Sequence, residues 1–172
     1  MTNTITSDSI TIRPATRADV PVILEFIRDL ARYERLEHEV SASEAELAEA
    51  LFGERRYAEV VFACSEGVPV GFALFFHNFS TFKGRPGIYL EDLFVRPEAR
   101  GQGIGKRLLA YLARTAVQRH CARLEWAVLD WNEPSIGFYR SLGAVPMDEW
   151  TTFRLTGDAL TLLAGSAAAG HR

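Results

Sequence analysis

The residue types best suited to chemistry stand together in one short segment, Arg100-Gly101-Gln102-Gly103-Ile104-Gly105-Lys106. An apolar run of strand-forming residues (88–95) precedes this segment, and an amphipathic run with helical spacing (104–117) follows it. The first turn of a helix leaves backbone N–H groups unpaired and is partly positive, and glycines let an anion approach those groups closely. With the charges of Arg100 and Lys106 added, the segment predicts a binding site for a pyrophosphate.

Two common phosphate-binding motifs do not fit this loop. A P-loop has glycine at the position of Arg100 and Ser or Thr at the position of Arg107. A dinucleotide-binding loop has the spacing G-x-G-x-x-G, whereas the glycines here alternate from Gly101 to Gly105. What remains is the pattern R-x-x-G-x-G, which can also mark a helix start that only packs closely against its strand.

Length and composition describe an ordinary globular domain. The chain has 172 residues, of which 48% are hydrophobic, and no apolar run approaches the roughly 18 residues of a membrane span. A formal net charge of -3 gives no reason to expect nucleic acid as a partner. Neither the histidines nor Cys64 and Cys121 have metal-ligand spacing, so we expect no metal and two free thiols. Without a signal-peptide pattern at the N-terminus, the sequence favours a cytoplasmic protein.

Hydrophobic periodicity, capping residues and turn residues together predict the secondary structure. The expected strands are 10–13, 60–64, 70–77, 88–95, 124–128, 144–149 and 152–155. The expected helices are 16–34, 43–53, 104–117 and 132–143, with a last helical turn at 156–163 and a loop at 78–87. These elements predict a single-domain α/β fold whose mixed central sheet has antiparallel N-terminal strands followed by a parallel strand-helix-strand crossover over 88–128. We expect this domain to cover residues 9–164, with flexible termini at 1–8 and 165–172.

Four further stretches extend the pattern of the glycine loop: Ile12-Arg13-Pro14-Ala15-Thr16, Leu30-Ala31-Arg32-Tyr33-Glu34, Tyr89-Leu90-Glu91-Asp92-Leu93-Phe94-Val95 and Trp131-Asn132-Glu133-Pro134-Ser135-Ile136-Gly137-Phe138-Tyr139. With the R-x-x-G-x-G loop, they resemble the GNAT superfamily of N-acetyltransferases, in which that loop binds acetyl-CoA. Within it, they look like the branch of the diamine (spermidine/spermine) and thialysine N-acetyltransferases. The resemblance spans about residues 10–155 and implies a GNAT fold, acetyl-CoA as co-substrate and a homodimer.

The resemblance also implies roles for individual residues. The pantetheine arm is expected along the main chain of Leu93, Phe94 and Val95. The pyrophosphate is expected on Arg100, Gly101, Gln102, Gly103, Ile104, Gly105 and Lys106. Further contacts with CoA are expected from Asn132, Ser135 and Tyr139. The amine acceptor is expected beside Tyr33, Glu34, Glu91, Asp92, Glu125, Trp126 and Ala127.

These residue types suit direct transfer of an acetyl group to an amine. An aliphatic ammonium has a pKa of ~10.4, so carboxylates that attract it and remove its proton would make it nucleophilic at pH 7. Glu91 is the first candidate for that proton relay, and Asp92 and Glu34 are candidates for binding the cation. Neighbouring strand residues face opposite ways, so Glu91 and Asp92 reach one cleft only across a bulge. The N–H of Phe94 or Val95 is expected to stabilise the oxyanion.

Tyr139 matches the residue proposed in this family as the general acid toward the leaving thiolate. One departure concerns the acceptor: Thr151 stands where the polyamine enzymes have an acidic residue, which leaves a smaller diamine, thialysine or another primary amine open. Two other functions remain open as well, a protein N-terminal or lysine acetyltransferase and an acetyl-CoA-binding regulatory module without turnover. The small-amine transferase is favoured over the regulatory module because binding CoA alone requires neither Tyr139 nor Glu91.

Overall fold

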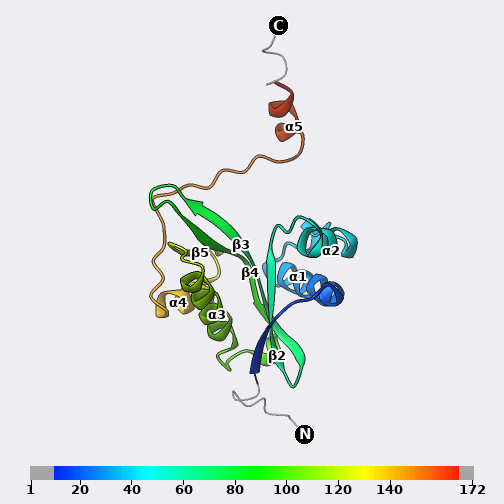
Figure 1. The fold of residues 1–172 in the computed structure, drawn as a ribbon, viewed down its shortest axis with the longest axis vertical. Helices are drawn as coiled ribbons and strands as arrows, with labels where there is room; N and C mark the ends of the chain where they lie inside the picture. The colour runs from blue at the N-terminus through cyan, green and yellow to red at the C-terminus, as the bar shows by residue number, and fades with distance from the viewer. Residues whose placement is uncertain (1–9, 167–172) are drawn as a thin grey trace. The chain divides into compact units, whose positions relative to one another are not determined.

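A mixed sheet of five strands organises the part of the chain that the computed structural model describes, residues 10–166 (Figure 1). The strands follow one another across the sheet in chain order: β1 (Ile10–Pro14), β2 (Glu59–Ser65), β3 (Val68–Ser80), β4 (Arg85–Val95) and β5 (Leu124–Trp126). β1 to β4 are antiparallel neighbours, whereas β5 pairs with β4 in parallel. The predicted α/β fold with a mixed sheet and a parallel crossover is confirmed.

Helices cover both faces of this sheet. α1 (Val20–Glu34) and α2 (Glu44–Phe52) lie on one face, and α3 (Ile104–Gln118), which forms the crossover, lies on the other (Figure 1). The short 3-10 segments are η2 (Arg17–Asp19), η3 (Glu37–Glu39) and η4 (Pro97–Ala99). Within residues 10–166, no helix has the length and apolar character that crossing a membrane requires.

Side chains close in sequence start the first two helices, as predicted. Thr16 and Asp19 form a reciprocal capping box, and so do Ser43 and Glu46. Asp19 also pairs with Arg13 at 2.8 Å, and this pairing holds the pKa of the Asp19 carboxyl well below its ordinary value. The start of the first helical segment is thereby tied to β1.

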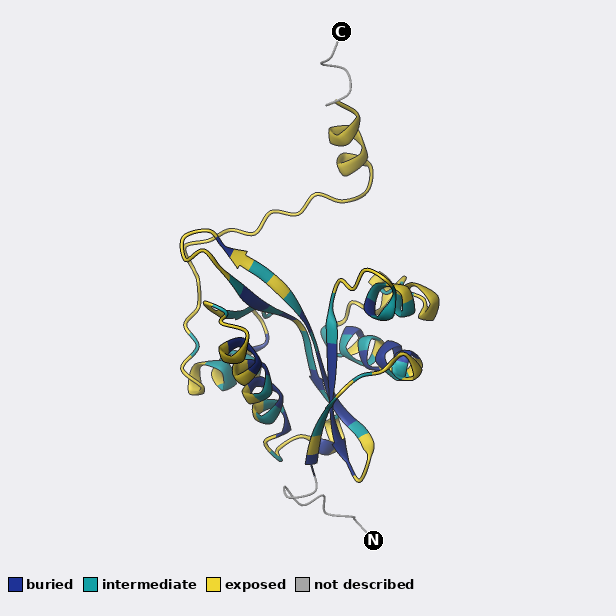
Figure 2. Cartoon of the chain, viewed as in Figure 1, coloured by how far each residue is buried: buried dark blue, intermediate teal, exposed yellow. Residues whose placement is uncertain are grey.

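An aromatic cluster fills the core between the sheet and α1. The ring centroid of Phe26 lies 5.7 Å from that of Phe62, 5.1 Å from that of Phe72 and 6.4 Å from that of Phe94. All four side chains are buried, and Figure 2 shows the middle of the sheet in the same dark blue. Phe94 belongs to β4, so its packing anchors in this core the strand that carries the predicted site.

The prediction of a loop at 78–87 is wrong. β3 and β4 continue toward each other as a hairpin, down to the pair Ser80↔Arg85, so that only residues 81–84 form the turn. Pro86 fits inside β4 because its main chain faces away from β3, and its carbonyl accepts a hydrogen bond from the Ala122 amide at 2.7 Å. Judged from residue types alone, the glycines and proline of this segment indicate a loop. The pairing of the two strands shows that they lie in a hairpin.

Residues from Val128 onward form a second compact unit, which contains α4 (Glu133–Ser141) and α5 (Gly157–Ser166). The strands predicted at 144–149 and 152–155 are absent, and nearly all of these residues are exposed. Alternating residues form a strand only when a neighbour supplies hydrogen bonds, and no described strand pairs with this segment. α5 runs into the expected C-terminal tail; the rest of that tail and the expected N-terminal one (1–8) lie outside the described residues.

Candidate active site

The loop between η4 and α3 holds two glycines in the left-handed region of backbone conformation. Gly101 has a φ of 77° and Gly103 a φ of 74°, angles that strain any residue with a Cβ atom. A Cβ atom added at either position would meet nothing within 4 Å. Close packing against the strand therefore does not explain these glycines, whereas the backbone conformation and an open surface do.

The backbone amides of residues 101–106 donate no hydrogen bond to any described residue. The first amide of α3 with an acceptor is that of Arg107, which donates to the Gly103 carbonyl at 3.0 Å. The earlier amides lie at the positive end of the helix dipole, and the exposed Lys106 adds a full charge. This set of donors fits the diphosphate of a molecule such as CoA.

β4 extends past its pairing with β5. The two strands pair over residues 88–90 only, whereas β4 continues to Val95. Hydrogen-bonded and non-bonded pairs alternate along an antiparallel ladder, and the Arg96 amide donates to a β3 carbonyl at 2.9 Å. The main chain of Phe94 therefore faces β3, and that of Leu93 and Val95 faces away from it. An extended ligand could add to this edge as a further strand would, through the Leu93 main chain and the Val95 amide, because the Val95 carbonyl already accepts a hydrogen bond from Arg100 Nε at 3.0 Å.

A bulge in β4 carries the two adjacent carboxylates. Leu74 of β3 pairs with Asp92, and the next residue, Phe75, pairs with Leu90, so Glu91 is the extra residue. Two neighbouring carboxylates of a strand can reach one cleft only across a bulge, and β4 has a bulge at this position. Glu91 is exposed, whereas Asp92 is partly buried.

The fold raises the pKa of the Asp92 carboxyl strongly. Burial raises the pKa of Asp92 to about 6, and the nearby charges of Glu91 and Glu34 act in the same direction. Burial also raises the pKa of Glu34, which ends α1. The three carboxylates are close enough to interact, which favours a cation beside them and lets Asp92 exchange a proton near neutral pH. No group of side chains with the makings of a metal site is found within residues 10–166.

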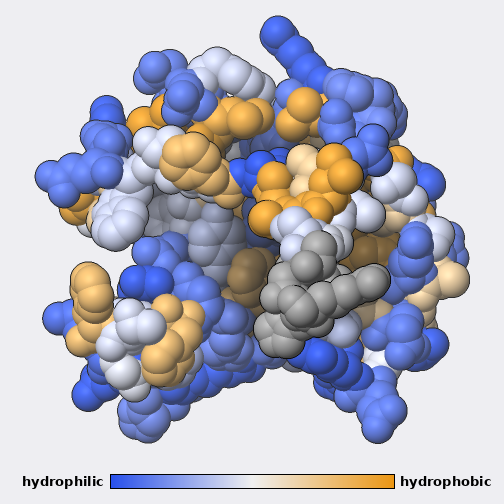
Figure 3. All heavy atoms as spheres, turned by 90° about the horizontal axis from the view of Figure 1, so that it is seen from above, coloured by the Kyte–Doolittle hydropathy of each residue, from blue (hydrophilic) through white to orange (hydrophobic). Residues whose placement is uncertain are grey.

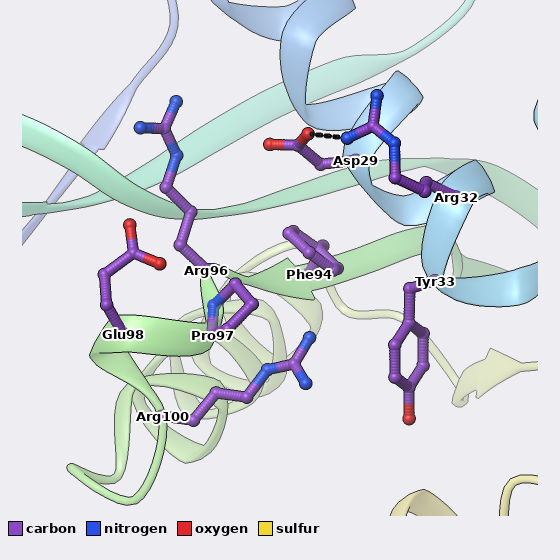
Figure 4. A pocket seen from close by; sticks show the side chains of 8 residues that line it. All are labelled: Asp29, Arg32, Tyr33, Phe94, Arg96, Pro97, Glu98 and Arg100. Carbon is purple, nitrogen blue, oxygen red and sulfur yellow. Dashed lines mark hydrogen bonds and ion pairs between the residues drawn. The ribbon is translucent and has the colours of Figure 1, made fainter.

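A cavity of about 390 Å³ lies between the end of α1 and the segment that follows β4 (Figure 4). It is lined by Asp29, Arg32, Tyr33, Phe94, Arg96, Pro97, Glu98 and Arg100. The sequence-based prediction includes Tyr33, Phe94 and Arg100 but omits the other five. The spacing of Asp29, Arg32 and Tyr33 places them on one face of a helix, but only the packing of α1 against the sheet shows what that face meets.

Arg100 extends from its loop toward α1. The carbon of its guanidinium lies 4.9 Å from the ring centroid of Tyr33 and 5.3 Å from that of Phe94, and its Nε donates to the Val95 carbonyl at 3.0 Å. Figure 4 shows the guanidinium directed into the space between these two rings. Among residues 10–166, no carboxylate forms an ion pair with it. Its expected contact with pyrophosphate stays a prediction.

Glu125 is engaged within the sheet. Its Oε2 accepts a hydrogen bond from the Asn78 side chain at 2.8 Å and pairs with Arg123 Nε at 2.7 Å. These contacts tie β5 to the end of β3 and direct the carboxylate toward protein groups. Trp126 ends β5 opposite the last residue before the bulge, and Ala127 follows it. The acceptor contacts expected of these residues stay predictions.

The remaining predicted residues lie on or beside α4, in the second unit. The buried Asn132 caps α4, because its side-chain oxygen accepts a hydrogen bond from the Ser135 amide at 3.4 Å. The ring centroid of Tyr139 lies 5.4 Å from that of its neighbour Phe138. The contacts with CoA expected of these residues, and the acid role of Tyr139, stay predictions.

Comparison with known proteins establishes the class. A model of the acetyltransferase (GNAT) family matches residues 23–144, a range that includes the glycine loop, the bulge of β4 and α4. The chain belongs to the acetyltransferase (GNAT) family. GNAT enzymes use acetyl-CoA as co-substrate, in agreement with the donor set at the start of α3.

Three proteins similar to this GNAT chain are informative, two through their named activity and one through its fold. A thialysine N-epsilon-acetyltransferase from Bos taurus is 42% identical over 165 residues, which cover 90% of this chain and 96% of the relative. An L-ornithine N5-acetyltransferase from Arabidopsis thaliana is 34% identical over 194 residues, covering 87% of this chain and 85% of the relative. Among solved structures, an integron cassette protein from the mobile metagenome of V. cholerae has a TM-score of 0.77 at 31% identity, covering 91% of this chain and 98% of that one. The findings together support an N-acetyltransferase with a small amine acceptor.

Proposed function

We propose that this GNAT enzyme transfers an acetyl group from acetyl-CoA directly to the primary amine of a small cationic acceptor, a diamine, polyamine or thialysine-like amino acid. One observation carries the proposal: a bulge with two carboxylates, a free main-chain edge and a loop of unpaired amides follow one another within residues 91–106. When bound, acetyl-CoA supplies the thioester carbonyl that the amine attacks. The residues of the chain hold its diphosphate, attract the amine and remove a proton.

The donor-binding roles follow from that arrangement. The amides of residues 101–106 and the charge of Lys106 hold the diphosphate. The outward-facing main chain of Leu93 and the Val95 amide hold the pantetheine arm through strand-like hydrogen bonds, since the Val95 carbonyl already accepts one from Arg100. The Val95 amide is the better oxyanion donor of the two candidates, because the Phe94 amide is directed toward β3.

Asp92 is the residue that best fits proton removal. The acceptor arrives as an ammonium with a pKa of ~10.4, and a carboxylate with a pKa of about 6 is mostly ionised at pH 7 and able to accept a proton directly or through water. Glu91 and Glu34 then attract the cation. The sequence favours Glu91 as the relay, but its exposure to solvent makes it the weaker of the two neighbours.

Tyr139 is the proposed acid for the leaving thiolate. A phenol with a pKa near ~10 that donates to a thiolate whose acid has a pKa near ~8.5 works against about 2 kcal/mol, a cost that a well-positioned donor tolerates. On the same unit, Asn132 and Ser135 are proposed to contact CoA. No covalent enzyme intermediate is needed, because a free amine attacks a thioester directly.

The alternative acceptors are less favoured. The names of the two relatives described above specify thialysine and L-ornithine, which are small molecules. Neither name points to a protein N-terminus or a protein lysine as the acceptor. A binding module without turnover would have no use for a carboxylate with a raised pKa beside its ligand.

Release of free thiol from acetyl-CoA with a panel of diamines, diamino acids and polyamines tests the proposal. We expect turnover with at least one small amine, and a loss in kcat/KM of about 100-fold or more in Asp92→Asn. Glu91→Gln should lose less. Binding of acetyl-CoA without thiol release from any amine would support the regulatory module instead. A larger loss in Glu91→Gln than in Asp92→Asn would return the relay to Glu91.

A homodimer in the cytoplasm is part of the same proposal. The second unit leaves Val145, Met147, Trp150 and Phe153 exposed, by 78%, 62%, 72% and 92%, and Figure 3 shows apolar side chains at the surface of the face it displays. Exposed apolar side chains in such number are typical of an association surface. Light scattering should give twice the mass of one chain, and a monomer mass would contradict the dimer. The free cysteines are compatible with a reducing compartment.

A further inference from the structure

We infer that Phe76 and Tyr89 form the surface on which the uncharged chain of the acceptor lies, so that these two rings make the enzyme favour acceptors with a longer chain. The inference rests on the proposed function, because it concerns the part of the acceptor beyond the reacting amine. Neither residue belongs to the site described above. The two rings add a contact that depends on chain length to a site in which the carboxylates recognise charge.

The register of the sheet places this aromatic pair on the same face as Asp92. Leu74 of β3 pairs with Asp92. Phe76 follows Leu74 by two residues and pairs with Tyr89. Alternate residues of a strand share a face, and the extra residue of the bulge lies in β4, so the alternation of β3 is regular across this stretch. The face is the one that α1 covers, since Leu74 packs against the aromatic cluster around Phe26.

The two rings contact each other and keep part of their surface exposed. Their centroids lie 5.3 Å apart, with an angle of 35° between the ring planes. Both side chains are half-buried, whereas Phe72 and Phe94 on the same face are buried against α1. β3 and β4 continue away from α1 toward their turn (Figure 1). An acceptor whose amine lies at Asp92 therefore meets exposed aromatic surface in the direction of that turn.

The distance from Asp92 to the aromatic pair suits the chain of a short diamine. Two residues of a strand span about 7 Å. In an extended chain of five methylenes, about six bonds, roughly 7 Å, separate the terminal nitrogens. The rings would therefore contact more of the methylenes in such an acceptor than in a shorter one.

Aromatic side chains suit both parts of an acceptor that extends beyond its reacting amine. Methylene groups that leave water for a ring gain free energy in proportion to the area they bury. A second ammonium group is attracted to the negative face of a ring. Glu125, which pairs with Tyr89 in the register of β4 and β5, is already held by Asn78 and Arg123. The contact that this part of the face offers is therefore mainly that of the rings.

Two acceptor series of increasing length test the inference. One series is the α,ω-diamines with two to five methylenes, and the other is the diamino acids with one to four side-chain methylenes. Thiol release is measured at saturating acetyl-CoA for the wild type, Phe76→Leu and Tyr89→Leu. For each acceptor, the kcat/KM of the wild type is divided by that of the variant, so that differences in amine pKa between acceptors cancel. We expect this ratio to grow about twofold with each added methylene, since leucine keeps part of the apolar contact that a ring provides.

Two control variants separate the rings from other effects. Tyr89→Phe keeps the ring, so its ratio should not depend on acceptor length. Phe79→Leu removes an exposed aromatic side chain from the opposite face of the same strand, and its ratio should not depend on length either. A loss of folded protein lowers the rate with every acceptor equally, so it does not change how the ratio depends on length.

A ratio that stays constant along the series in the two leucine variants of the aromatic pair would overturn the inference. So would a wild type that releases thiol with polyamines but with no member of either series. Both results leave the proposed acetyl transfer intact. Only the absence of thiol release with every amine, polyamines included, contradicts that proposal.

Discussion

Asp92→Asn should make the folded protein more stable at pH 7 while it slows the enzyme. The environment that raises the pKa of Asp92 from its ordinary value of 3.8 to about 6 disfavours the ionised carboxylate in the folded state. A tenfold change in the ionisation constant corresponds to about 1.4 kcal/mol, so the ionised side chain destabilises the fold by at most about 3 kcal/mol. Because Asp92 keeps some contact with solvent, we expect a measured gain of about 1–2 kcal/mol.

The pH dependence of this gain has a definite sign. An acid whose pKa is raised by folding destabilises the fold only where it is ionised, so the penalty is absent below the unfolded pKa, grows between about pH 4 and pH 6, and is complete above. Asparagine carries no charge at any pH. The variant should therefore melt about 2–6 °C above the wild type at pH 7. The difference should shrink toward zero near pH 4.

Thermal unfolding of the wild type and Asp92→Asn at pH 7 and pH 4 tests this prediction. The kcat/KM of the same samples is measured as well. Glu91→Gln is the matched control, because Glu91 is an exposed carboxylate on the same bulge, and its change in stability should stay within about 0.5 kcal/mol. An Asp92→Asn protein that is no more stable at pH 7, or equally more stable at pH 4, would refute the argument from charge. A gain in stability with a loss in rate is expected when a catalytic charge is held in an unfavourable environment.

Three further substitutions test other parts of the account. Gly103→Ala should raise the KM for acetyl-CoA and lower stability by about 1 kcal/mol in chemical denaturation, because a φ of 74° strains alanine. Tyr139→Phe should lower kcat with little change in the KM for acetyl-CoA; full activity across pH 7–9 would contradict the acid role. Asp19→Asn should cost about 1–2 kcal/mol at pH 7, since it weakens the pair with Arg13 and the capping box. Pairing lowers the pKa of Asp19, so this difference should be full above about pH 4 and fade only at strongly acidic pH; an equal difference there would exclude charge as its source.

Elements that depend on neighbouring residues could be predicted from the sequence. The capping box of Ser43 and Glu46 closes within one helical turn, and the glycine loop before α3 likewise depends on local spacing. The hairpin at 78–87 is local too, because Ser80 pairs with Arg85, but its glycines and proline indicate a loop and hide this pairing. The strands expected between 144 and 155 fail for the converse reason: their alternation is local, but a ladder needs a partner that the described sheet does not provide.

The candidate site is likewise predictable only where it depends on local sequence. The sequence indicates a phosphate-binding loop and two adjacent carboxylates, but it does not show which carboxylate is buried, since that depends on the register between β3 and β4. Glu91 becomes the extra residue only because Leu74 and Phe75 pair with the residues on either side of it. The direction of Arg100 is equally non-local, because its contact with Tyr33 requires α1 to pack beside the end of β4.

Both interruptions of the sheet fall at one place on β4. Pairing with β5 stops at Leu90, and Glu91 is the residue that β3 leaves unpaired, so the strand loses one neighbour and shifts against the other at the same point. A regular ladder would satisfy the main chain on both sides and would leave neither a free edge nor a carboxylate beside it. Here Asp92 comes within range of the carboxylate that ends α1, and the free edge of Leu93 and Val95 begins at the next residue. Two departures from regular pairing at one point thus bring the proposed amine site and the proposed thioester site to adjacent residues of one strand, which is the proximity that direct transfer needs.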